Sequence, residues 1–274
     1  MTATTILVTG ATSGIGREAA RALARQGALV VVGARDAARG RAVVDDLSAA
    51  AGGRADLLVL DLASFASIRE AAARALSARP AIDVLVNDAG TAVRHREVTA
   101  DGHERTWQTN YLGGFLLTRL LMPALRATKA PRIVNVASEA HRTGHIDFAN
   151  LELERGYGAY RAYSNTKLAQ VLFTRELARR EPGIAVNAVH PGTIATNIWR
   201  PAPAWARLLI RILLPRPEKG AAPVVRLASA PALEGVTGRY FDRLREATPS
   251  EAARNDADAR RLWEISEKAV GSAA

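Results

Sequence analysis

Tyr163 and Lys167 stand four residues apart in the segment AYSNTKLAQ, so a helix would place both side chains on one face. A proton donor works best when its pKa is near the working pH, and a phenol with a pKa near 10 is too weak an acid for that role. A fixed ammonium one helical turn away favours the phenolate and lowers that pKa. The pair therefore predicts a proton donor, unless an aromatic residue and a lysine share a helix face by chance.

A glycine-rich stretch, TGATSGIG at residues 9–16, lies between an apolar run and a helical pattern. Gly10 permits a tight turn, Gly14 allows backbone to approach a pyrophosphate, and Gly16 permits close helix packing. Thr12, Ser13 and Ile15 complete the predicted phosphate-binding turn. Three glycines alone are weak support for a dinucleotide site, and the alternative is an ordinary strand-to-helix turn.

The elements around this turn alternate between strands and helices along the chain. We expect strands at residues 4–9, 28–34, 55–62, 82–88, 132–138 and 184–192, and helices at residues 16–27, 36–50, 64–78, 107–125 and around Tyr163. Continuous apolar strands indicate a parallel sheet that helices cover on both faces. The sequence predicts a single domain over residues 1–274 with a doubly wound, three-layer α/β/α architecture. Ligands of such sheets bind beyond the carboxyl ends of the strands.

With that context, the chain resembles the short-chain dehydrogenases/reductases. The resemblance rests on TGATSGIG, LVNDAG (85–90), TNYLGGFLLT (109–118), RIVNVASEAH (132–141), the Tyr163/Lys167 pair and VHPGTIAT (189–196), and it covers nearly the whole chain. The segments EKGAAPVVRLA, GVTGRYF and LWEISEK are most similar to the retinol-dehydrogenase-like branch. A Rossmann fold, a nicotinamide cofactor and hydride transfer between a carbonyl compound and an alcohol are implied.

The resemblance also implies roles for individual residues. Tyr163 would give the proton, Lys167 would hold the nicotinamide ribose, Ser138 would polarise the substrate oxygen, and Asn110 would support a water that relays protons to Lys167. Ser138 is alternatively an ordinary helix cap, and Asn110 a buried polar residue that bends a helix. Tyr157 and Tyr160 lie nearby, but neither has a lysine four residues later.

Arginines near the end of the second predicted strand favour NADP(H) over NAD(H). Ala34 stands where NAD-preferring relatives carry an acid, and Arg35 follows it, with Arg39 one turn later and Arg17 on the first helix. A guanidinium offers a planar fork to a phosphate. The alternative is that these are three more arginines in an arginine-rich protein, and Asp36 is the one feature that supports NAD(H).

The remaining cofactor contacts are implied by resemblance alone. Asp61 would bond the adenine amino group, unless it is only a turn acid. The other implied contacts are Leu62, Asn87, Ala89, Gly90, Pro191, Gly192 and Thr196. Asp88 departs from the family pattern, which commonly has a second asparagine there.

The composition argues against disulfides, a metal site, a membrane span and nucleic-acid binding. The chain has no cysteine, which excludes disulfides and thiolate metal sites, and we expect no metal. A signal peptide is not evident, and no apolar stretch reaches the roughly 18 residues that span a bilayer, so a cytoplasmic protein is expected. The net charge of +10 comes from scattered arginines, since only four of 37 basic residues are lysines. Without a binding motif this charge does not indicate nucleic-acid binding.

The segment at about 193–217 interrupts the α/β pattern and contains Trp199 and Trp205. We expect it to close over a lipophilic or aromatic substrate, while ARLLIRILL (206–214) could alternatively lie on a membrane surface. Gly113 and Gly114 permit close approach either of the sheet or of a partner helix, and the resemblance implies a homodimer. A protein that keeps the fold as a cofactor sensor or scaffold, without catalysis, remains the alternative function.

Overall fold

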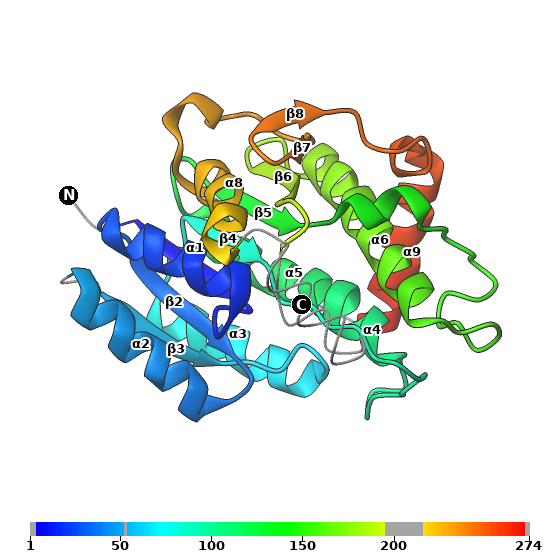
Figure 1. Ribbon diagram of the computed structural model, residues 1–274, viewed down its shortest axis with the longest axis horizontal. Coiled ribbons are helices and arrows are strands. Elements are labelled where there is room, and N and C mark those ends of the chain that lie inside the picture. Colours follow the sequence, from blue (N-terminus) through cyan, green and yellow to red (C-terminus); the bar gives the residue numbers. More distant parts are fainter. Residues whose placement is uncertain (1–3, 52–53, 195–215, 272–274) are drawn as a thin grey trace.

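A single eight-stranded sheet organises the chain in the computed structural model, which describes residues 4–51, 54–194 and 216–271 (Figure 1). The strands are β1 (Thr5–Thr9), β2 (Leu29–Ala34), β3 (Ala55–Val59), β4 (Val84–Asn87), β5 (Arg132–Val136), β6 (Ala185–His190), β7 (Tyr240–Asp242) and β8 (Arg245–Ala247). Their order is β3-β2-β1-β4-β5-β6-β7-β8, and every neighbouring pair is parallel except β7 with β8.

The strand order reverses between β1 and β4. From β1 the chain moves outward through β2 to β3, and then returns to the other side of β1 with β4. Thr9 and Asn87 are the paired last residues of these two strands. A crevice beyond their carboxyl ends is where doubly wound sheets bind ligands.

Helices cover both faces of the sheet and create two cores. One core contains Ile6 and Val8 of β1 together with side chains of α1 (Gly14–Arg25), α2 (Ala37–Ala51) and α8 (Pro217–Ser229). The other contains Leu7 together with side chains of α3 (Phe65–Ala78), α5 (Gly113–Arg126), α6 (Ala159–Arg180) and α9 (Asp256–Val270). Successive strand residues point to opposite faces, so both can be apolar only because both faces are covered. The predicted three-layer, doubly wound fold is confirmed.

All six predicted strands are shorter in the structure, and two further strands were not predicted. The third strand ends at Val59, before the predicted residue 62, because Asp61 begins a turn in which its Oδ1 accepts the backbone N–H of Ala63 at 3.0 Å. The antiparallel hairpin of β7 and β8 was not predicted as strands, since three residues are too few to show a period.

Helix α9 packs against both α5 and α6, as Figure 1 shows for α6. Trp263 of α9 stacks on Phe173 at 5.8 Å between ring centroids and meets Phe115 edge-on at 5.0 Å. Gly113 packs against the segment after β3, since a Cβ on it would lie 2.5 Å from the carbonyl oxygen of Leu62, and a Cβ on Gly114 would lie 4.0 Å from the side chain of Asn87. The homodimer that the resemblance implies stays a prediction.

The predicted substrate segment falls mainly outside the described residues, which omit 195–215. Trp199, Trp205, Thr196 and the stretch 206–214 belong to that omitted part. Across the three described ranges, no helix combines the length and the apolar character that crossing a bilayer requires.

Candidate active site

The glycine turn and the loop after β4 meet at the switch point of the sheet. A Cβ on Gly10 would lie 2.8 Å from the backbone of Ala89, and Gly10 has a φ of 72° that disfavours other residues. Thr9 ties the loops together, because its Oγ1 accepts the backbone N–H groups of Asp88 and Ala89 at 3.1 and 3.2 Å. Glycine is therefore required at position 10 by both backbone conformation and space.

The first turn of α1 fits a dinucleotide phosphate. Ser13 is its N-cap residue and makes no side-chain cap bond, and the first turn contains no acid. Gly14 also has a left-handed φ of 58°. Thr12, Ser13, Gly14 and Ile15 are all partly exposed. The N–H groups at a helix N-terminus attract an anion, and in this first turn the Asp88 carboxylate already lies against Gly16.

Asn87 supports the same fit at the end of β4. Its Nδ2 donates to Asn135 at 2.9 Å and to Thr118 at 3.1 Å, whereas its buried Oδ1 has no partner among the described residues. A buried acceptor without a partner is costly and indicates that a donor arrives with a ligand. The residues present therefore fit a nicotinamide dinucleotide.

The arginines proposed for NADP(H) lie beyond the end of β2. Arg35 and Arg39 are both exposed. Asp36, the residue that supports NAD(H), accepts the backbone N–H of Arg39 through its Oδ1 at 3.0 Å. Its side chain thus caps the first turn of α2. Arg17 forms an ion pair with Asp46 at 3.1 Å. Arg35 and Arg39 are consequently better placed than Arg17 for a phosphate.

The remaining predicted contacts line the crevice from both sides. Asp61 acts as the turn acid described above, and the adjacent Leu62 is buried against Gly113. Gly90 is exposed next to Asn110, whose Oδ1 lies 3.5 Å from an added Cβ.

The segment after β6 closes the opposite side of the crevice. Pro191 is buried and Gly192 has a φ of 98°, which strongly favours glycine. Ile194 and Ile15 both lie within 3.0 Å of a Cβ added to Gly220, so this segment reaches the glycine turn.

The hydroxyls of Tyr163 and Ser138 lie close together. Burial nevertheless raises the pKa of Tyr163 to about 12, and the interaction with Ser138 offsets only part of that rise. The predicted lowering of the Tyr163 pKa by Lys167 is therefore wrong for the protein's own groups. Ser138 also caps the following 3₁₀ turn, since its Oγ accepts the Ala140 N–H at 3.2 Å.

Lys167 lies beneath the Tyr163 ring, with its Nζ 5.4 Å from the ring centroid. This ammonium donates to the carbonyl of Val136 at 2.7 Å and to Oε1 of Gln170 at 2.9 Å. Burial lowers the pKa of Lys167 to about 8, and the charge of Asp88 opposes this. An ammonium has three donors, so two are used by the protein and one remains for a ligand hydroxyl.

Asn110 lies in a π-helical turn, Gln108–Leu112, between the short helix α4 (Arg105–Trp107) and α5. Its Oδ1 accepts the Thr91 N–H at 2.7 Å, and its Nδ2 donates to the Thr91 carbonyl and to Thr166 at 2.9 and 3.2 Å. Its side chain thus joins the loop after β4 to α6. The structure is compatible with both interpretations of Asn110. It is a buried polar residue in an irregular helix, and it also borders the site, where it could support a proton relay.

The other two tyrosines of this region are engaged elsewhere. Tyr157 donates to the Val93 carbonyl at 2.9 Å, and the Tyr160 hydroxyl contacts Thr143 at 3.0 Å. Neither hydroxyl shares the environment of Lys167.

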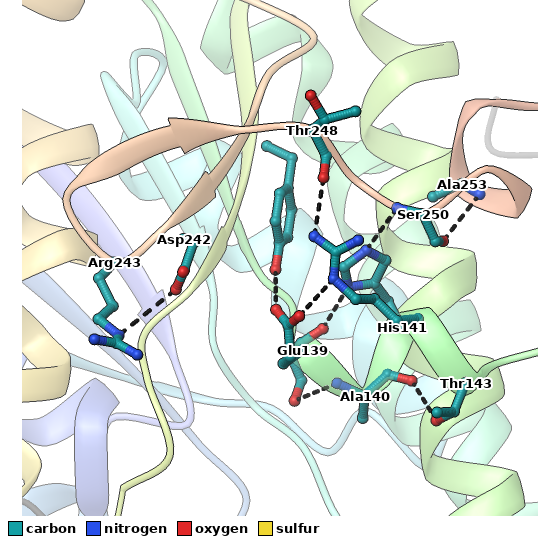
Figure 2. A network of polar contacts seen from close by, with 12 residues as sticks. Glu139, Ala140, His141, Thr143, Asp242, Arg243, Thr248, Ser250 and Ala253 are labelled. Atoms are coloured by element: carbon teal, nitrogen blue, oxygen red, sulfur yellow. Dashed lines mark hydrogen bonds and ion pairs between the residues drawn. The ribbon is translucent and has the colours of Figure 1, made fainter.

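His141 is a buried residue whose part in the site the sequence did not reveal (Figure 2). Its Nδ1 donates to the Ser138 carbonyl at 2.7 Å, and its Nε2 accepts the Ser250 N–H at 3.1 Å. This pattern requires the neutral ring, and burial lowers the His141 pKa accordingly. In the sequence, the only signal of this role was a histidine three residues after Ser138. The hydrogen bonds of His141 to Ser138 and Ser250 indicate that the C-terminal region helps to hold Ser138 in place.

Asp88 is a second residue whose importance the sequence left open. Its Oδ2 would lie 2.5 Å from a Cβ on Gly16, and the Gly16 N–H donates to its carboxylate. Burial raises the pKa of Asp88 from 3.8 to about 7, although the charge of Lys167 lowers it. An asparagine in this position could not change charge, so this acid gives the site a titration near neutral pH.

Asp88→Asn is expected to make folding stability less dependent on pH. The folded protein holds the Asp88 proton more tightly than the unfolded chain, so the wild-type protein loses stability as the pH rises from 3.8 towards about 7. The stability of the variant relative to wild type should therefore increase over that window and then level off. Urea denaturation at several pH values measures it, and a difference that is constant across the window would contradict this prediction.

Comparisons with known proteins agree with this geometry. A family model described as short chain dehydrogenase matches residues 4–207. Mouse retinol dehydrogenase 14 is 41% identical over 97% of this chain and 86% of its own length. Mouse polyprenol dehydrogenase is 43% identical over 94% of this chain and 81% of its own length.

A solved structure shares the arrangement of the elements. The RhlG/NADP active-site complex of Pseudomonas aeruginosa is 29% identical, with a TM-score of 0.72 over 87% of this chain and 94% of that chain. The sheet order, the glycine turn and these matches together establish that the chain belongs to the short-chain dehydrogenase/reductase family, in its retinol-dehydrogenase-like branch.

Proposed function

We propose that this oxidoreductase is NADP(H)-dependent and interconverts a lipophilic carbonyl compound and the corresponding alcohol. The observation that carries the proposal is the proximity of the Tyr163 and Ser138 hydroxyls to each other and of the Tyr163 ring to the Lys167 ammonium, at the carboxyl end of β5. This arrangement supports the proposed roles of Tyr163 as proton donor, Ser138 as the hydroxyl that binds the substrate oxygen, and Lys167 as the cation beside a dinucleotide crevice.

The residues divide the work of the reduction as follows. The bound cofactor supplies the hydride. Ser138 donates a hydrogen bond to the substrate oxygen and stabilises its developing charge. Tyr163 gives its proton to that oxygen, because an alkoxide is a stronger base than a phenolate. Lys167 remains charged beneath the ring and holds a ribose hydroxyl with its third N–H.

The raised Tyr163 pKa bears on the direction of the reaction. With a pKa of about 12 in the protein's own surroundings, Tyr163 holds its proton at neutral pH and is ready to donate. Alcohol oxidation requires the phenolate, so its rate should rise with pH more steeply than the rate of reduction.

Two relatives support a lipophilic substrate. Retinol and polyprenol, for which they are named, are both isoprenoid alcohols. We propose a lipophilic or aromatic carbonyl compound, or the corresponding alcohol, as substrate. A cytoplasmic location also remains our prediction.

The direct test measures NADPH consumption with retinal, long-chain isoprenoid aldehydes and aromatic ketones, beside small polar carbonyl compounds. Turnover with the apolar compounds supports the proposal. Tight NADPH binding without turnover on any compound would instead favour the catalytically silent sensor or scaffold.

The preference for NADP(H) is expected to depend on Arg35 and Arg39. The double variant Arg35→Ala/Arg39→Ala should raise the KM for NADPH by roughly 10- to 100-fold and leave the KM for NADH nearly unchanged, because each guanidinium forms charge-assisted bonds to the phosphate. Arg41→Ala is the matched control, since Arg41 is exposed further along α2. A wild-type preference for NADH would overturn this assignment.

A further inference from the structure

Gln170 connects the ammonium of Lys167 to the backbone of Asn110. Its Oε1 accepts from Lys167 Nζ at 2.9 Å, and its Nε2 donates to the Asn110 carbonyl at 2.8 Å. Only 5% of Gln170 is exposed, and Lys167 and Asn110 are equally well buried at 4% and 2%. The resemblance implied a water between Asn110 and Lys167, whereas here a side-chain amide spans from one to the other.

The chemistry of the two partners fixes the orientation of this amide. An ammonium can only donate and a carbonyl can only accept, so Oε1 must face Lys167 and Nε2 must face Asn110. A flipped amide would oppose donor to donor and acceptor to acceptor, and burial would make both mismatches costly. Gln170 therefore has a single satisfied state, which also fixes where the Lys167 Nζ lies.

We propose that Gln170 is a positioning residue, which holds the Lys167 ammonium below Tyr163 through its amide oxygen while the π-helical carbonyl of Asn110 anchors its amide nitrogen. With Val136 as the second acceptor, two of the three ammonium donors are fixed, and the third is left for a ligand. The importance of this placement for catalysis rests on the proposed function, but the placement itself does not.

Gln170 also stabilises the charged form of Lys167. Hydrogen bonds to an ammonium favour its protonated state, whereas burial opposes it and lowers the Lys167 pKa to about 8. The titratable groups that act on Lys167 are Asp88, from the loop after β4, and Tyr163, on its own helix. Loss of the Gln170 oxygen should therefore release the proton of Lys167 at lower pH.

The test follows Lys167 by NMR in protein labelled at lysine Cε, without cofactor. The chain contains only Lys129, Lys167, Lys219 and Lys268, so four signals are expected, and Lys167→Arg identifies one of them. In Gln170→Met, the midpoint of the Lys167 titration should fall by about one pH unit, the shift that one charge-assisted hydrogen bond produces. In Gln170→Glu, which keeps an acceptor and adds a negative charge, the midpoint should rise.

Controls separate this effect from general disruption. Gln108→Met makes the same substitution at another buried glutamine, whose side chain bonds Asp101, and it should leave the Lys167 midpoint in place. Repeating the titrations in an Asp88→Asn background removes the overlapping titration of that acid. Should Gln170→Met fail to fold, the opposite shift in Gln170→Glu still tests the contact, and unchanged midpoints in both variants would overturn the inference.

Steady-state kinetics distinguish the inference from the proposed function. If the Lys167 midpoint moves in the variants but the wild-type protein turns over no carbonyl substrate, Gln170 positions Lys167 and the enzymatic proposal fails. If turnover persists and the midpoint does not move, the enzyme proposal stands and the role of Gln170 is refuted. If the enzymatic proposal and the role of Gln170 are both correct, the basic limb of the plot of kcat against pH should move with the Lys167 midpoint. In Gln170→Met it should move to lower pH.

Discussion

Tyr163→Phe is expected to lower turnover of NADPH with a carbonyl substrate by roughly 10²- to 10⁴-fold, the usual contribution of a positioned proton donor. The phenylalanine ring keeps the packing of Tyr163 and its contact with the Lys167 ammonium, and only the hydroxyl beside Ser138 is lost. NADPH affinity should therefore change little. Stopped-flow measurement of NADPH oxidation, with binding followed separately by fluorescence, provides both values.

Tyr160→Phe is the matched control for this substitution. Tyr160 lies on the same helix and is 62% exposed, and its hydroxyl contacts Thr143 rather than Ser138. Its removal should leave turnover within about twofold. A Tyr163→Phe protein that binds NADPH and retains near wild-type turnover would show that another group donates the proton.

Trp263→Ala should lower the free energy of unfolding by about 3–5 kcal/mol, the range for deleting a buried tryptophan. Trp263 is only 1% exposed, stacks on Phe173, meets Phe115 edge-on and lies under the guanidinium of Arg180 at 4.5 Å. Its loss removes aromatic contacts of α9 with α5 and α6. Urea denaturation with an unchanged m value measures the loss.

Leu244→Ala serves as the control, because Leu244 is 48% exposed on the turn between β7 and β8. It should alter stability by less than about 0.5 kcal/mol. Light scattering on the wild-type preparation tests the implied homodimer, because a monomer has a mass of 29.2 kDa and a dimer has twice that mass. A small stability loss in Trp263→Ala would show that α9 contributes little to the fold.

How far the site could be predicted depends on how local its signals are. The glycine turn and the Tyr163/Lys167 spacing lie within short segments whose secondary structure follows from period and turn chemistry. The part played by His141 in holding Ser138 depends on Ser250, which is 109 residues away, and no local pattern encodes such a contact. The bridge from Lys167 to Asn110 through Gln170 spans 60 residues and needs the packing of α6 against the π-helical turn.

By itself, the sequence determined the doubly wound sheet, the family and the position of the crevice, because strand periodicity and glycine conformations are properties of short stretches of chain. Only the tertiary structure decided the electrostatics of the crevice. Burial raises the Tyr163 pKa against the expected effect of a nearby cation, and it turns Asp88 into a group that titrates near pH 7. Both outcomes depend on how much water the packed elements exclude, which no spacing of residues along the chain can reveal.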